Sequence, residues 1–175
     1  MRRRLLVGLA AVVLAVVGYM FVARGKSVEP RLIPVQPTSA IGSGSSAVGV
    51  SAEGAVLTWL PPPKGSSLPR LPLSGPPKSG HLAGPALQQA RVLGAAPAEL
   101  RPYLKSSRYG ESGVDVELIS GVELRFGDAS EAAKKWRAAA AVLADPSVTA
   151  LDYVDLHAPG RPAIWGSGHA LPSVP

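Results

Sequence analysis

The sequence contains no cysteine and few aromatic residues. None of its 175 residues is Cys, and Phe, Trp and Tyr together make up 5% of the chain. Disulfides, thiolate zinc clusters and a cysteine nucleophile are therefore excluded. With so few large rings the hydrophobic core has to be modest, and the 18 Pro and 19 Gly residues predict many connections. We expect one small β or α+β domain, the size that this length allows.

The sequence also lacks the motifs of common catalytic and metal sites. His81, His157 and His169 show neither HExxH nor HxH spacing, so metal ligation is not indicated. A GxSxG elbow, a P-loop and an SxxK motif are absent. Asp152 and Asp155 stand three residues apart in an expected strand, where they point to opposite faces and form no built-in carboxylate pair. We expect no enzymatic activity, no metal, no cofactor and no small-molecule substrate.

The basic charge of the chain does not indicate a nucleic-acid partner. The formal net charge is +6, but Arg2, Arg3 and Arg4 supply three of the 18 Lys and Arg residues. The remaining 15 basic residues stand against 12 acidic ones, a net charge of +3, and they are scattered without a basic stripe interleaved with aromatics. A solvated surface explains this remainder, and we expect no nucleic acid to bind.

A long apolar run near the N-terminus predicts a membrane anchor. Leu5 to Ala23 contains no charged residue and no proline, and it nearly fills the roughly 20 residues of a transmembrane helix. The three preceding arginines, against Arg24 and Lys26 behind, favour a cytoplasmic N-terminus and an exported remainder. The alternative is a cleaved signal peptide, but the run is longer than usual and Phe21 occupies a position where cleavage requires a small residue.

Proline punctuates the first half of the exported part. Residues 27–46 read as a juxtamembrane linker, and Ala47–Trp59 alternates around Glu53-Gly54, which predicts a hairpin. The proline-rich loop that follows is expected to run along the sheet surface. Residues 85–93 and 97–104 are predicted to be short helices because each has a proline near its start.

Two alternating runs between Val114 and Phe126 predict a hairpin with one buried face. A two-residue turn would pair apolar with charged side chains, and because the pleat has period two that register is wrong by one. A three-residue loop over 119–121 instead pairs apolar residues with one another. It also places Gly121 at a left-handed position. The predicted pairs are Leu118 with Val122, Val116 with Leu124, and Val114 with Phe126.

A helix and two further strands complete the expected fold. The spacing of Asp128 and Glu131 is that of a capping box, with Ser130 as a competing cap, and Asp145-Pro146 ends the helix. Residues 151–166 read as two strands around a Pro-Gly turn. The order strand, strand, helix, strand, strand predicts an α+β fold with a largely antiparallel sheet. The helix's predicted apolar stripe comprises Ala132, Ala133, Trp136, Ala139, Ala140 and Leu143, with Lys134, Lys135 and Arg137 away from it.

These features together resemble the exported β domain of the FtsQ/DivIB bacterial cell-division proteins. The likeness rests on the anchor, on Leu-Pro-Arg-Leu at Leu68–Leu71 and on GVELRFG at Gly121–Gly127 before a Lys-rich helix. It is closest in YVDL at Tyr153–Leu156 followed by AIWG at Ala163–Gly166. Members of this family usually carry a POTRA domain between anchor and β domain, and the short stretch between them here implies that this chain lacks one.

The resemblance implies a noncatalytic docking platform. In the family, the last strands bind a small bitopic partner of the FtsB/DivIC type, in complex with an FtsL-type protein, by strand addition at a sheet edge. Tyr153 and Trp165 would be the aromatic contacts, unless they pack on the domain's own core or helix. The implied partner-binding residues are Tyr153, Asp155, Leu156, Arg161, Ala163, Ile164, Trp165 and Gly166.

The expected organisation has five parts. They are a basic cytoplasmic N-terminus over 1–4, a transmembrane helix over 5–23, a flexible linker over 24–46, an extracytoplasmic β domain over 47–166 and a disordered tail over 167–175. We expect a single-pass protein of the cytoplasmic membrane that acts as a division scaffold at the septum. The alternatives are an anchored envelope protein whose β domain no longer serves division, and an exported hydrolase, for which the histidine spacing offers no support.

Overall fold

A computed structural model describes residues 35–60, 62 and 68–171 of the chain. They belong to a unit that begins at Val35. Among these residues, none of the helices has the length and apolar character that a bilayer crossing requires. The predicted transmembrane helix from Leu5 to Ala23 and the basic N-terminus before it lie outside the described residues.

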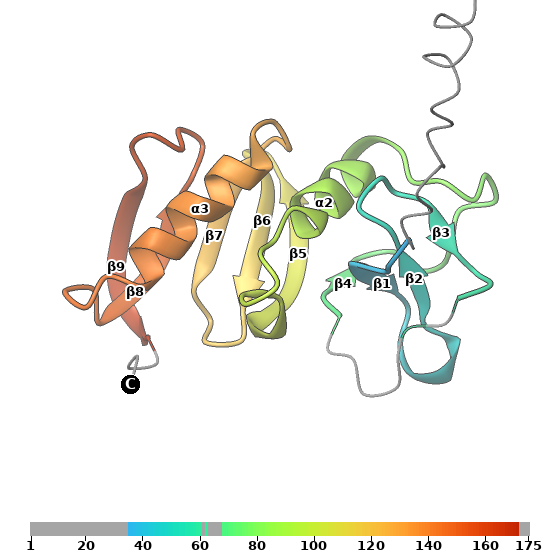
Figure 1. The fold of residues 1–175 in the computed structure, drawn as a ribbon, viewed down its shortest axis with the longest axis horizontal. Helices are drawn as coiled ribbons and strands as arrows, with labels where there is room; N and C mark the ends of the chain where they lie inside the picture. The colour runs from blue at the N-terminus through green and yellow to red at the C-terminus, as the bar shows by residue number, and fades with distance from the viewer. Residues whose placement is uncertain (1–34, 61, 63–67, 172–175) are drawn as a thin grey trace, which may run out of the picture. The chain divides into compact units, whose positions relative to one another are not determined.

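The described residues form one nine-stranded sheet, in the order β3-β2-β1-β4-β5-β6-β7-β8-β9 (Figure 1). The strands are β1 (Ser39–Ile41), β2 (Val48–Val50), β3 (Val56–Leu57), β4 (Arg70–Leu71), β5 (Leu104–Gly110), β6 (Gly113–Leu118), β7 (Glu123–Gly127), β8 (Ala150–Asp155) and β9 (Ala163–Ala170).

The predicted α+β class is confirmed, but the sheet is more mixed than expected. The pairs β1–β4, β4–β5 and β7–β8 are parallel, while the other five pairings are antiparallel. Two of the parallel pairs are joined by segments that contain α2 (Gly84–Gly94) and α3 (Ala132–Leu143). A parallel pair needs such a crossover connection.

The two helices cover the same face of the sheet (Figure 1). Trp136 of α3 is fully buried, its ring centroid lies 4.8 Å from that of Phe126, and its indole N–H donates to the carbonyl oxygen of Val92 in α2 at 2.7 Å. Beneath the helices lie Val116, Leu124 and other apolar residues of β6, β7 and β8. The opposite face of these strands carries most of their charged side chains.

The first part of the sheet contains more structure than the sequence indicated. The predicted hairpin is confirmed as β2 and β3, with Val50 opposite Val56. The predicted linker over 24–46 is wrong at its end, because Ser39–Ile41 is a strand that pairs with β2. The proline-rich loop does not simply run along the sheet surface: Arg70–Leu71 enters the sheet between β1 and β5.

The predicted hairpin of β6 and β7 is confirmed, apart from one step of register. Val116 lies opposite Leu124, and the N–H of Leu118 donates to the carbonyl of Val122 at 2.9 Å. Gly121 has the expected positive φ of 96°. Val114, however, lies opposite Gly127 rather than Phe126, because the register shifts between Val114 and Asp115.

The helix after this hairpin begins differently from the prediction. Glu131 precedes α3 in a left-handed conformation, with φ of 49°, and its side chain caps no helix N–H. The capping box is therefore wrong: Asp128 instead accepts from Ser130 and from Lys135. Within α3, Lys135 is buried and Ala133 is exposed, the reverse of the predicted stripe.

Two further boundaries are corrected. The predicted helix over 97–104 is only a 3-10 turn, η2 (Arg101–Tyr103), because β5 begins at Leu104 and pairs with β6. The predicted tail over 167–175 begins too early, since β9 continues to Ala170, which lies opposite Ala150. Two glycines in the stretch Gly166–Gly168 allow a bulge that returns the chain to the sheet.

Candidate docking edge

Strand β9 forms one edge of the sheet, and every one of its eight residues is exposed. It pairs on one side with β8, where Tyr153 lies opposite Trp165 and Val154 lies opposite Ile164. Trp165 is 67% exposed and Ile164 is 47% exposed. An edge strand presents a row of backbone N–H and C=O groups to any extended chain that approaches it.

The backbone direction of β9 follows from two hydrogen bonds. The N–H of Leu156 donates to the carbonyl of Arg125 in β7 at 2.8 Å, so by alternation the backbone groups of Tyr153 and Asp155 face β9. The N–H of Leu171 donates to the carbonyl of Thr149 at 2.9 Å, which gives the same alternation. Trp165 lies opposite Tyr153 and therefore turns its backbone groups toward β8. Ile164 then turns its N–H and C=O toward the free edge.

A bulge interrupts β9 directly after Ile164 and Trp165. Leu151 lies opposite His169 and Tyr153 opposite Trp165, so three residues of β9 stand opposite Asp152 alone. Gly166 has φ of 83°, a conformation that glycine adopts without steric cost. The N–H of Gly168 donates to the Asp152 carboxylate at 2.9 Å. Such bulges bend an edge strand and break its ladder.

Tyr153 and Trp165 lie together on the face that the helices leave open. Directly opposite residues of an antiparallel pair share a face. Above the Tyr153 ring lies the Arg125 guanidinium, 3.6 Å from the ring centroid, and its Nε donates to Glu123 at 2.7 Å. Neither aromatic residue belongs to the buried core. A cation held over the ring keeps Tyr153 in a fixed orientation beside Trp165.

Further from β9, charged side chains of β5, β6 and β7 form ion pairs with one another. Arg108 of β5 pairs with Glu123 of β7 and lies 3.3 Å from Asp115 of β6. Burial, followed by the charge of Glu123, raises the pKa of Asp115 above its usual value. Burial also raises the pKa of Glu123, but hydrogen bonds from Arg125 and Arg108 lower it overall.

One implied partner-binding residue is corrected by the structure. Leu156 is fully buried in the core and offers no surface to a partner. Leu156 directly follows β8 and stands two residues after the buried Val154, so the pleat places both side chains on the helix-covered face. Arg161, Ala163 and Gly166 are exposed. Tyr153 and Asp155 are half-buried, and Asp155 is engaged by His157.

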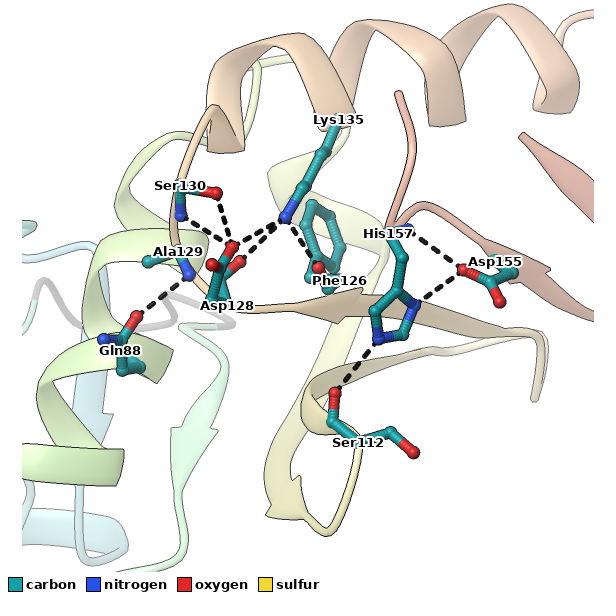
Figure 2. Close-up of polar contacts among 9 residues, drawn as sticks. All are labelled: Gln88, Ser112, Phe126, Asp128, Ala129, Ser130, Lys135, Asp155 and His157. Carbon is teal, nitrogen blue, oxygen red and sulfur yellow. Dashed lines mark hydrogen bonds and ion pairs between the residues drawn. The ribbon is translucent and has the colours of Figure 1, made fainter. Parts of the chain in front are cut away.

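His157 joins the end of β8 to the turn between β5 and β6 (Figure 2). Its Nδ1 lies 2.7 Å from Oδ1 of Asp155, and its Nε2 lies 3.1 Å from the carbonyl oxygen of Ser112. Both partners accept hydrogen bonds, while neutral imidazole carries a single N–H, so the geometry favours the protonated ring. The bond to Asp155 raises the pKa of His157. Burial raises the pKa of Asp155, but bonds from His157 lower it overall.

Beside His157, the buried Lys135 fastens α3 to the end of β7 (Figure 2). Its ammonium donates to the carbonyl of Phe126 at 2.8 Å and to the Asp128 carboxylate at 2.9 Å. Hydrogen bonds from Ser130 and Lys135 lower the pKa of Asp128 to about 2. The charged groups of Lys135 and Asp128 thus have hydrogen-bond partners within the cluster, and these contacts stabilise the fold.

The described residues hold no group of three or more His, Asp or Glu side chains placed to bind a metal. Asp152 and Asp155 have separate partners, Gly168 and His157.

Sequence reasoning missed three residues that shape this edge. Arg125 orients Tyr153, Asp152 enters the bulge, and His157 ties down the start of the loop to β9. The pair Gly166 and Gly168 was the available signal, because isolated glycines in a strand mark bulges. The partners of Arg125 and His157 depend on parallel pairing across α3, which the sequence pattern did not indicate.

The fold and this edge define a class: a small α+β domain with a mixed sheet, helices on one face and a long exposed edge strand. A family model described as "Cell division protein FtsQ/DivIB, C-terminal" matches residues 42–157. The chain therefore belongs to the FtsQ/DivIB family of bacterial cell-division proteins. The matched segment ends before β9. No curated protein matched the sequence.

Proposed function

We propose that this chain is a noncatalytic docking platform of the division machinery, held at the cytoplasmic membrane by the predicted span from Leu5 to Ala23. Its partner is a bitopic protein of the FtsB/DivIC type, in complex with an FtsL-type protein, and it binds by adding a strand to β9. The observation that carries this proposal is the exposure of all eight β9 residues at a sheet edge.

Three features support strand addition at this place. Ile164 directs its backbone groups outward, which supplies the hydrogen bonds of an added strand. Trp165 offers a large exposed apolar surface on the open face. Aromatic side chains that become buried at an interface commonly supply much of its binding energy. Arg125 holds the neighbouring Tyr153 ring in place, so less conformational freedom is lost on binding.

The experiment compares two exposed tryptophans in the full chain. Trp165→Ala is expected to weaken binding of the FtsB/DivIC-type protein of the same organism by about tenfold or more. Trp59→Ala is the matched control, because Trp59 is 73% exposed and follows β3 at the other end of the sheet. Circular dichroism should be unchanged in both variants. Equal binding by both variants and the wild type would count against the proposal.

A second candidate is an anchored envelope protein whose β domain no longer serves division. The specific observation in its favour is that the family match ends at residue 157, so the β9 edge lies beyond it. The two candidates differ in location. A fluorescently tagged full chain should form a midcell band if it serves division, whereas uniform envelope fluorescence supports the second candidate.

A further inference from the structure

The bulge in β9 encloses the side chain of Asp152. An added Cβ at Gly166 would lie 1.8 Å from Oδ2 of Asp152, and one at Gly168 would lie 2.2 Å from Oδ1. Both glycines are therefore needed for the backbone to approach the carboxylate this closely. The carboxylate also accepts the N–H of Gly168 at 2.9 Å. The backbone of the three-residue bulge thus packs directly around the Asp152 carboxylate.

The contact between Asp152 and the bulge changes which backbone N–H and C=O groups β9 exposes at its free edge. In a regular strand, alternate residues beyond Ile164 would direct their N–H groups toward the free edge. Here the N–H of Gly168 is engaged by Asp152, and the register shifts by two residues between Trp165 and His169. The bulge thus separates the regular segment Ala163–Trp165, which carries the exposed aromatic side chain, from the paired end of β9 at His169 and Ala170.

We propose that Asp152 is a positioning residue for partner docking. Its carboxylate holds the bulge over Gly166–Gly168 and thereby fixes the orientation of Trp165 and the outward direction of the Ile164 backbone. This inference rests on the proposed docking at β9 and adds the residue that sets the geometry of that edge. Asp152 lies in β8, behind β9 as seen from an approaching strand, and acts through β9.

The test uses the full chain with Asp152→Ala, Asp152→Asn and Asp145→Ala. Asp145 is the matched control, an exposed carboxylate that accepts the backbone N–H of Ser147 at 2.9 Å in a different turn. Amide hydrogen exchange at Gly168 and affinity for the FtsB/DivIC-type protein are measured for each variant. Asp152→Asn retains an oxygen that can accept the Gly168 N–H.

Asp152→Ala is expected to speed exchange at Gly168 by about tenfold and to weaken partner binding by about tenfold. Exchange in β5, β6 and β7 should be unchanged. Asp152→Asn should bind within about threefold of the wild type, because it restores the acceptor without the charge. Asp145→Ala should match the wild type in both measurements. Rescue by the Asn variant separates a positioning role from general loss of structure.

The outcomes distinguish this inference from the proposed function. Unchanged Gly168 exchange in Asp152→Ala would overturn the bulge contact, whatever the partner does. Faster Gly168 exchange with undiminished partner binding would overturn the positioning role. If Trp165→Ala also leaves binding intact, docking at β9 itself fails, while the exchange measurement still reports on the bulge.

Discussion

The indole N–H of Trp136 donates to the carbonyl oxygen of Val92 at 2.7 Å and so joins α3 to α2. Both residues are fully buried, and the Trp136 ring also lies against Phe126 of the sheet. One side chain thus connects both helices and the strand layer beneath them. Leu151 and Val154 of β8 belong to the same hydrophobic core as Trp136, and β8 pairs with the candidate docking strand β9.

Replacing Trp136 is expected to destabilise the protein, and two variants separate the contribution of its hydrogen bond from that of its side-chain volume. Trp136→Phe keeps an aromatic ring but removes the N–H, and it should lower the free energy of unfolding by about 1–3 kcal/mol. Trp136→Ala also creates a cavity and should cost about 3–5 kcal/mol. Urea denaturation measures both. Trp59→Phe, at an exposed position, is the control and should change stability by less than about 0.5 kcal/mol.

The turn between β5 and β6 requires glycine at one position and tolerates alanine at another. Gly113 has φ of 101°, and an added Cβ would lie 2.2 Å from the carbonyl oxygen of Gly127. Gly113→Ala should therefore lower the free energy of unfolding by about 2 kcal/mol or more. The matched control is Gly110→Ala, where the nearest atom to an added Cβ is 4.0 Å away. Similar thermal midpoints for the two variants would contradict this account of the turn.

The contacts of His157 predict a pH dependence of stability. Its hydrogen bond to Asp155 raises the pKa of His157 in the folded protein above the ordinary histidine value of 6.5, so the folded state binds the proton more tightly than the unfolded chain. The stabilisation is complete below pH 6.5 and is lost as the pH rises through the folded value. Because the ring is partly exposed, the loss should be modest, roughly 0.5 kcal/mol.

A comparison with His157→Gln isolates this contribution. The difference in free energy of unfolding between the wild type and His157→Gln should shrink as the pH is raised from about 6 to about 9. Urea denaturation at each pH gives the difference, and the other two histidines cancel because both proteins contain them. A difference that grows with pH would show that the neutral ring is the form that the fold prefers.

The sequence predicted those elements whose pattern is local. The apolar alternation from Val114 to Leu124 determined the β6–β7 hairpin because each apolar residue had to reach the same buried face. The spacing of Trp136 and Ala139 likewise identified the buried side of α3. The burial of Lys135 was not predicted in this way, because a buried ammonium is stable only where oxygen partners surround it, here the carbonyl of Phe126 and the carboxylate of Asp128 at the end of β7.

What the sequence did not predict depends on contacts between distant segments. β1 and β4 are three and two residues long, too short for periodicity, and they exist because neighbouring strands pair with them. Leu156 resembled a partner contact within a family motif, yet its place in the core follows from parallel pairing of β8 with β7. The exposed edge was expected from the resemblance, while its bulge required the structure.

In the proposed complex, a partner strand pairs with the outward backbone of β9 at Ile164. Binding of the FtsB/DivIC-type protein to the full chain should be compared for Ile164→Pro and Ile164→Ala. Proline removes the outward N–H, which β8 does not use, and edge positions tolerate it. Alanine shortens the side chain and keeps the N–H. Ile164→Pro is expected to weaken binding by about tenfold relative to Ile164→Ala, and equal affinities of the two variants would contradict strand addition at this edge.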